Sequence, residues 1–415
     1  MSLWSRRRFL ALSAATTALS SAISPGARAA LGSRRVDSRW IDAWGASFLP
    51  TLRNGVLDPV PTFDRQTLRV ILFSKLGGTR ARVKFTNRFQ AEPLRIGAAR
   101  IALRDGAGGG TIIAGTDRAL TCGGLSSVTL APGEERWSDP VDLAVPQHAD
   151  VAVSLFLPTA NYTPTAVHGT GSKTSFLSAP GDHTSALTMP PQSAHDTTVM
   201  VFFVAGLQVT APARTRVIVA FGDSITDGAA SEVDGNASWP DVLSLRLPAL
   251  RNGAPVSVIN MGIGSNRLVA SDRAGPSGVK RFSDDVLARP NVSHVIVLEG
   301  INDISYEHAP PEQLIAAYQS LIARARARNI KVYGATLLPI QKSVKDTPRN
   351  KATRQAVNAW IRDAGAFDAV IDFERVVRNP ANPLAIRDDL TTDHVHPNSV
   401  GYRMMGEAID LGLFE

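Results

Sequence analysis

The stretch that decides the fold is VIVAFGDSIT, residues 217–226. Its apolar start, Val217 to Ala220, is typical of a buried strand, and Ser224 follows shortly after the expected strand end. Open α/β sheets carry their chemistry at the ends of their strands, which makes Ser224 a candidate nucleophile. The tripeptide Gly-Asp-Ser alone is more typical of an ordinary turn, so the prediction needs support from other segments.

The segment DHVHP, residues 393–397, supplies the partners that a serine nucleophile requires. A free serine hydroxyl is a poor nucleophile at neutral pH and needs a base. Asp393 and His396 stand three residues apart, so both side chains can face one way on a turn and complete a Ser-His-Asp relay. His394 is the competing base because it is adjacent to Asp393. The spacing favours His396.

The remaining histidines are not expected to act as the catalytic base. His294 begins an apolar strand, His308 precedes Pro310 in a loop, and four lie in the first half of the chain, namely His148, His168, His183 and His195.

Two further polar segments follow apolar runs between these ends. NMGIGSNR, residues 260–267, follows Val256–Ile259, and GIND, residues 300–303, follows Val295–Leu298. We therefore expect polar groups from four segments at one edge of a sheet, enough for a nucleophile, a base with its acid and an oxyanion hole. Asn302 can donate from its amide to a developing oxyanion. A turn after a strand also explains GIND when it is taken alone.

With these four segments in this order, residues 215–415 resemble the SGNH, or GDSL-type, hydrolases. The resemblance implies Ser224 as nucleophile, His396 as base and Asp393 as the partner of that base. It also implies an oxyanion hole that contains the Ser224 N–H and the side chain of Asn302.

One position departs from the family pattern. The family usually has glycine five residues after the asparagine of its second segment, which is Asn260 here. That position is Ser265, and Gly264 stands one place earlier. If the position requires a positive φ, serine adopts it at a cost of about 1 kcal/mol. Both Gly264 and Ser265 remain candidates for the backbone N–H of the oxyanion hole.

A narrower resemblance rests on longer segments: FGDSITDG at 221–228, WPD at 239–241, LEGINDI at 298–304 and AFDAVIDF at 366–373. They are similar to an SGNH subgroup of arylesterases and acylhydrolases associated with xylan-degradation genes. That resemblance implies ester groups on plant or microbial polysaccharides as one candidate substrate. It does not choose acetyl over a longer or an aromatic acyl group.

The spacing of apolar and helical segments along the chain predicts two domains of different fold class. Strands are expected at 217–221, 256–260, 294–299, 331–336 and 368–373, and helices near 239–247, 279–288, 311–328, 350–362 and 399–411. Successive βα units predict a flavodoxin-like, doubly wound parallel sheet in a domain that spans 215–415. Short apolar or alternating runs broken by turn residues predict an all-β sandwich or jelly-roll domain over 36–210. Residues 210–215 are expected to link the two.

The first 29 residues are typical of a twin-arginine signal peptide. SRRRFL at 5–10 precedes an apolar stretch from Phe9 to Ile23, and Ala27-Arg28-Ala29 offers a cleavage site. The apolar stretch is shorter than the roughly 20 residues that span a bilayer, so a periplasmic or secreted product is expected. Removing the four arginines of this segment lowers the formal charge from +7 to +3. Such a small excess does not predict nucleic acid binding.

The sequence lacks the residues that several other kinds of chemistry require. Cys122 is the only cysteine, so no intrachain disulfide can form, and a packed thiol is expected. No Cys/His cluster has metal-ligand spacing, so we expect no metal and no cofactor. GIGSNR at 262–267 misses the dinucleotide fingerprint, and the G-x-S-x-G elbow of ordinary α/β-hydrolases is missing from the sequence. The sequence thus predicts an exported serine esterase, with a non-catalytic glycan-binding protein or a lipid acylhydrolase as alternatives.

Overall fold

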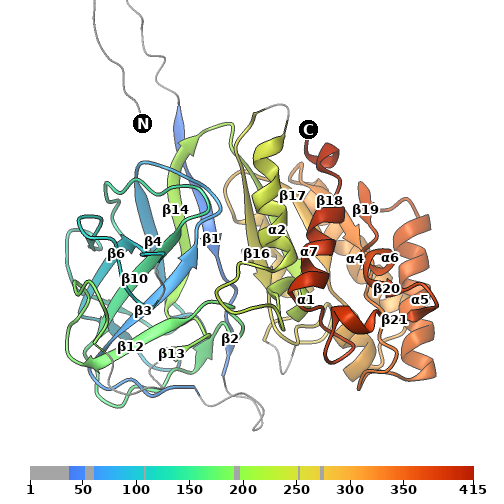
Figure 1. Ribbon diagram of the computed structural model, residues 1–415, viewed down its shortest axis with the longest axis horizontal. Coiled ribbons are helices and arrows are strands. Elements are labelled where there is room, and N and C mark those ends of the chain that lie inside the picture. The colour runs from blue at the N-terminus through green and yellow to red at the C-terminus, as the bar shows by residue number, and fades with distance from the viewer. Residues whose placement is uncertain (1–36, 52–59, 107–108, 191–196, 251–252, 272–274) are drawn as a thin grey trace, which may run out of the picture. The chain divides into compact units, whose positions relative to one another are not determined.

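Antiparallel strands make up the first half of the described chain, which comprises residues 37–51, 60–106, 109–190, 197–250, 253–271 and 275–415 of the computed structural model (Figure 1). One sheet has the order β1 (Ser38–Gly45), β14 (Val204–Pro212), β4 (Ala81–Thr86) and β9 (Glu135–Trp137). A second has the order β13 (Thr197–Thr198), β12 (Ser175–Pro180), β3 (Gln66–Phe73), β10 (Asp150–Leu157), β6 (Ala98–Leu103) and β7 (Arg118–Leu120). Two short pairs join β11 (Ala166–Val167) to β2 (Leu49–Pro50) and β5 (Leu94–Ile96) to β8 (Val128–Leu130). The expected signal peptide, residues 1–29, lies outside the described residues.

The two antiparallel sheets share a hydrophobic core. Ile41 and Leu207 from the first sheet are fully buried in it, together with Val70 and Val153 from the second. Strand β4 alternates buried and partly exposed residues at its start, as a strand with one face on a core does. An all-β region is therefore present where the sequence predicts one, and the choice between sandwich and jelly roll stays a prediction.

A parallel sheet forms the centre of the second half. Its order is β16 (Val256–Gly262), β15 (Arg216–Gly222), β17 (Val292–Leu298), β18 (Lys331–Ala335) and β19 (Ala369–Ile371), and every neighbouring pair is parallel. The first strand in the chain thus lies inside the sheet, between the second and the third. This order is that of the predicted flavodoxin-like fold, in which ligands bind beyond the carboxyl ends of the strands.

Helices connect these strands. They are α1 (Ser224–Asp227), α2 (Trp239–Arg246), α3 (Gly278–Phe282), α4 (Pro311–Arg326), α5 (Pro348–Asp363), α6 (Phe373–Val377) and α7 (Ser399–Ala408). Their contacts form two groups, because α7 packs on α2 and α6 whereas α4 packs on α3 and α5. Such a grouping is what a doubly wound sheet requires. The helix predicted at 279–288 is α3 continued by a π-helical turn, Ser283–Leu287, and α6 was not predicted.

Shorter elements complete the chain. They are the π-helical turn η3 (Asp303–Glu307), the 3₁₀ turns η1 (Leu247–Ala249), η4 (Asp388–Leu390) and η5 (Leu411–Phe414), and the strand pair β20 (Arg378–Asn379) and β21 (Asn382–Ile386).

The predicted linker at 210–215 is wrong in its bounds. Strand β14 continues to Pro212, where it still pairs with Ser38 of β1, and β15 begins at Arg216. Only Ala213 to Thr215 connect the two strands, and Thr215 is 1% exposed. The polar residues that suggest a linker are here part of a strand, β14, which pairs with β1.

The all-β region packs directly on the parallel sheet, with β1 beside β16. Polar pairs cross this contact. Arg289 lies 2.9 Å from Asp42, and the Ser47 hydroxyl donates to Asp285 at 2.8 Å. One hydrophobic cluster includes buried residues of both parts, and residues 37–415 form a single compact unit.

Candidate active site

Ser224 is the first residue of α1 and lies just after the end of β15, an interior strand of the sheet. The side chain of Asp223 caps this short helix by accepting the Ile225 N–H at 2.9 Å. Gly222 is required at the turn, because a Cβ there would lie 2.2 Å from both the Leu298 carbonyl oxygen and the Thr226 Oγ1. The strand, the tight turn and the cap together hold Ser224 at the carboxyl end of the sheet.

Ser224, His396 and Asp393 form a continuous chain of hydrogen bonds. The Ser224 Oγ lies 2.8 Å from Nε2 of His396, and Nδ1 of the same ring lies 2.6 Å from Oδ2 of Asp393. The i, i+3 spacing therefore brings both side chains to one side, as expected. The structure places this trio together although Ser224 and His396 are far apart in sequence.

Hydrogen bonds keep Asp393 charged. Partial burial alone would raise its pKa. The His396 ring and the backbone N–H groups of His396 and Val395, at 2.8 and 2.9 Å from Oδ1, instead hold the pKa of Asp393 well below its usual range. A carboxylate that faces Nδ1 keeps the proton on that nitrogen and leaves Nε2 as an acceptor for the serine hydroxyl.

His394 has a different partner. It has a φ of +60°, and its Nδ1 lies 3.8 Å from Oδ1 of Asp388. Asn398 caps α7 through the N–H groups of Val400 and Gly401, so the segment before that helix is fixed.

Asn302 follows β17 and is 3% exposed. Its Nδ2 donates to the Asn266 carbonyl at 2.9 Å, and its Oδ1 accepts from the Lys345 Nζ at 2.9 Å. An ammonium group can only donate, so the amide oxygen must face Lys345 and the NH₂ group must face the other way. One amide N–H is bound to Asn266, and the second remains to donate.

Lys345 was not identified from sequence. It lies in the loop SVKDTP, residues 343–348, whose composition is that of a solvated loop. In the structure it is 7% exposed, its Nζ is 4.2 Å from the ring centre of Tyr306, and its carbonyl accepts from the side chain of Asn350. No local pattern marks a lysine that turns inward.

The loop after β16 holds both candidate backbone donors. Ser265 adopts a φ of +61°. Gly264 does not have a positive φ. The side chain of Asp303 accepts the N–H groups of Leu268 and Val269 at 2.6 and 2.8 Å, as expected of a residue that fixes the loop.

Asn260 and Asn266 both brace this region. Asn260 binds the carbonyls of Thr226 and Asp227, and Asn266 binds the carbonyl of Pro276. The structure thus gives both residues bracing contacts.

Arg281 is a second residue that sequence reasoning missed. Its side chain is 2% exposed and donates to the carbonyls of Gly222 and Met261 at 2.8 and 2.7 Å. It also contacts Asn266, Asp285 and Glu299. It thereby ties the ends of β15, β16 and β17 behind the site. Burial raises the pKa of Glu299 to about 8 although Arg281 lies 3.0 Å away.

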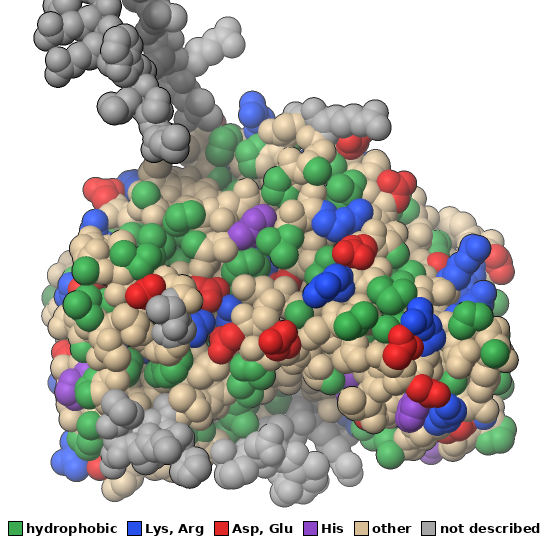
Figure 2. Space-filling model, in the orientation of Figure 1, with side chains coloured by type: hydrophobic (Ala, Val, Ile, Leu, Met, Phe, Trp, Pro, Cys, Tyr) green, Lys and Arg blue, Asp and Glu red, His purple; other side chains and the backbone are tan. Residues whose placement is uncertain are grey.

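Other residues lie where the sequence predicts. His294 is buried on its strand, and Cys122 is a buried free thiol. Among the described residues no group of three His, Cys, Asp or Glu is arranged to hold a metal, and no described helix is long and apolar enough to cross a membrane. On the face in Figure 2, Lys and Arg are interspersed with Asp and Glu. The predicted lack of nucleic acid binding stays a prediction.

Residues 220–404 match the model of the GDSL-like lipase/acylhydrolase family. The chain therefore carries a GDSL-like acylhydrolase domain and is a carboxylic ester hydrolase. The matched stretch contains Ser224, Asn302, Asp393 and His396. No curated protein sequence matches the chain.

Several solved structures are similar to part of the chain. A G-D-S-L family protein from Desulfitobacterium hafniense is 26% identical, with 46% of this chain and 96% of the other covered and a TM-score of 0.37. An aryl esterase from M. smegmatis is 18% identical, over 46% and 95%, with a TM-score of 0.38. A carbohydrate acetylesterase from Sinorhizobium meliloti is 17% identical, over 46% and 95%, with a TM-score of 0.37.

Proposed function

We propose that the protein is an exported serine esterase in which Ser224 attacks the ester carbonyl. His396 takes the serine proton and returns it to the leaving alcohol, while Asp393 holds the imidazole tautomer. Water then hydrolyses the acyl-enzyme by the same proton route. The observation that carries this proposal is the hydrogen-bond chain from Ser224 through His396 to Asp393, at 2.8 and 2.6 Å.

The oxyanion of the tetrahedral intermediate would be bound by three donors. These are the Ser224 N–H, the Ser265 N–H and the free amide N–H of Asn302. Between the two backbone candidates, we favour Ser265 because it stands where the family usually has glycine and adopts a φ of +61°, which glycine accommodates without strain. The contact of Lys345 with the amide oxygen polarises Asn302 and strengthens its N–H as a donor.

Ester groups on polysaccharides are the substrate that we propose. The segments that resemble the xylan-associated subgroup support it. Tyr306 supports it as well, because it follows Asn302 by four residues and its side chain is exposed (52%). A flat ring beside the oxyanion hole can stack on a sugar or on an aryl acyl group. Neither observation selects the acyl group.

Ester hydrolysis by the parent and by Ser224→Ala tests the mechanism. Turnover of a short p-nitrophenyl ester should be lost in the variant and should not change when a chelator is added to the parent. Equal turnover by the two proteins, together with retained glycan binding, would favour the non-catalytic alternative. Parallel assays with acetylated xylan, an aryl ester and a phospholipid separate the three carriers of the acyl group.

Export is proposed from the sequence of residues 1–29. The mass of the exported form tests it, because the mature chain should begin near Ala30. A membrane-bound product that retains residues 1–29 would contradict this assignment.

A further inference from the structure

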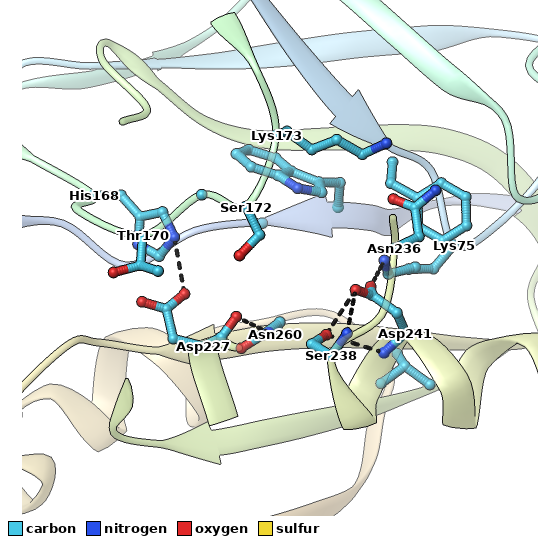
Figure 3. A pocket seen from close by; sticks show the side chains of 15 residues that line it. Lys75, His168, Thr170, Ser172, Lys173, Asp227, Asn236, Ser238, Asp241 and Asn260 are labelled. Atoms are coloured by element: carbon cyan, nitrogen blue, oxygen red, sulfur yellow. Dashed lines mark hydrogen bonds and ion pairs between the residues drawn. The ribbon is translucent and has the colours of Figure 1, made fainter. Parts of the chain in front are cut away.

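A small polar cavity lies where the all-β region meets the parallel sheet (Figure 3). Its volume is about 60 Å³, which is room for a few water molecules and too little for a sugar. His168, Thr170 and Lys75 reach it from the all-β region, and Asp227 and Asn260 from the other side. The side chains that line this cavity, rather than its volume, determine what it can do.

His168 has a hydrogen-bond acceptor at each ring nitrogen. Its Nδ1 lies 3.0 Å from the carbonyl oxygen of Ser47, and its Nε2 lies 3.2 Å from Oδ1 of Asp227. A neutral imidazole has a single N–H and cannot satisfy two acceptors. Burial lowers the pKa of His168, but the carboxylate of Asp227 and the Ser47 carbonyl raise it above its ordinary value. The pair therefore shares a bound proton, with Arg281 as the nearby opposing charge.

Asp227 connects this pair to the oxyanion loop. It is the last residue of α1, the helix that begins with Ser224, and its carbonyl accepts from the side chain of Asn260, whose Oδ1 accepts the Gly262 N–H at 2.9 Å. Gly262 packs so closely that an added Cβ would lie 2.2 Å from the Asp227 backbone nitrogen. The loop therefore rests on Asp227 by close backbone packing and through the side chain of Asn260.

This support holds Ser265 in its backbone conformation. A φ of +61° is unfavourable for serine and persists only where the surroundings enforce it. The loop before it is held through Gly262, and the all-β region comes close at the next glycine, because an added Cβ at Gly264 would lie 3.5 Å from the Thr170 Oγ1.

We propose that His168 of the all-β region is a positioning residue for the oxyanion hole. By binding Asp227, on which Gly262 packs, it holds the loop in place and keeps the Ser265 N–H directed at the site where the oxyanion forms. The all-β region is then part of the catalytic unit. This inference rests on the proposed serine esterase mechanism.

Loss of this positioning should destabilise the transition state rather than the bound substrate. Loss of one oxyanion donor lowers kcat by about 10²- to 10³-fold, so a misdirected donor should lower it by about 10- to 100-fold. The substrate ground state gains little from that donor. KM should therefore change by less than about threefold.

Steady-state kinetics of His168→Ala and His168→Gln test the proposal in the full-length protein. The alanine variant should show the drop in kcat, and glutamine, whose amide can donate to Asp227, should restore most of it. Lys75→Met is the matched control, since Lys75 pairs with Asp241 across the same contact without reaching the oxyanion loop. It should lower the melting temperature but leave the kcat of the folded protein near the parent value.

The proposal is overturned if His168→Ala keeps the parental kcat, or if glutamine is as poor as alanine. If the alanine variant does not fold, Asp227→Asn takes its place, with an expected fall in kcat of about tenfold and an unchanged kcat as the contrary result. Labelling of Ser224 by a fluorophosphonate distinguishes failure of the serine mechanism from failure of the role proposed for His168. A parent that is not labelled would disprove the serine mechanism, whereas a labelled parent with a fully active His168→Ala would disprove only the role of His168.

Discussion

Lys345 is a buried cation whose ammonium group meets the amide oxygen of Asn302 at 2.9 Å. The charge does two things there. It fixes which end of the amide faces the site, and it lies near the position where negative charge would develop during acyl transfer. Fixed positive charge in a site with little water stabilises such a transition state more than it stabilises the neutral ester.

Replacing Lys345 by methionine should lower kcat for a p-nitrophenyl ester by about 10- to 100-fold with little change in KM. Methionine keeps much of the side-chain volume and removes the charge. Lys351→Met is the control, because Lys351 pairs with Asp346 at 2.6 Å in the same neighbourhood and has no contact with Asn302. Equal kcat values for the two variants would remove Lys345 from the mechanism.

The choice between the two histidines makes a second prediction at this scale. His396→Ala should lower kcat by several powers of ten, on the order of 10⁴ or more, because the ring acts in the transition state. His394→Ala should cost far less, since its ring lies beside Asp388. Asp393→Asn should fall between them. A larger loss in His394→Ala than in His396→Ala would reverse the assignment.

At the scale of elements, the ends of β15, β16 and β17 are joined by Arg281. The guanidinium binds the carbonyls of Gly222 and Met261 and the carboxyl group of Glu299. Glu299 is fully buried and its pKa is raised to about 8. The folded state therefore holds a proton on Glu299 that the unfolded chain releases near the ordinary glutamate pKa of 4.5.

Stability should fall as the pH rises from about 4.5 to 8, because the unfolded state binds fewer protons at this residue over that range. Glu299→Gln keeps the shape and removes the titration, so its free energy of unfolding should depend less on pH. Urea unfolding at pH 5 and pH 8 measures the difference. Glu312→Gln, on the exposed start of α4, should behave like the parent. Identical pH slopes for the parent and Glu299→Gln would refute the assigned protonation.

At the scale of the whole molecule, the sequence predicts the parallel sheet well because its strands are buried on both faces. Such strands leave continuous apolar runs, as at Val217–Ala220 and Val295–Leu298, and polar segments then mark their ends. The same logic brings Ser224, Asn302 and His396 to one edge. All these signals are local in the sequence.

The contacts between the all-β region and the parallel sheet leave no such signal. His168 and Asp227 are 59 residues apart in the chain, and Lys75 and Asp241 are 166 apart. Each is a single charged residue in ordinary surroundings until the fold brings its partner. Likewise, the extension of β14 beyond residue 210 depends on pairing with β1, which composition does not reveal.

Covalent labelling of Ser224 tests the central claim most directly. A fluorophosphonate should react once with the parent, forming a bond from the serine Oγ to phosphorus as fluoride leaves, and peptide mass mapping should place the adduct on Ser224. Ser224→Ala should remain unlabelled, His396→Ala should react more slowly by powers of ten, and His394→Ala should react at close to the parental rate. An adduct on another residue, or equal labelling of His396→Ala and the parent, would contradict the proposed mechanism.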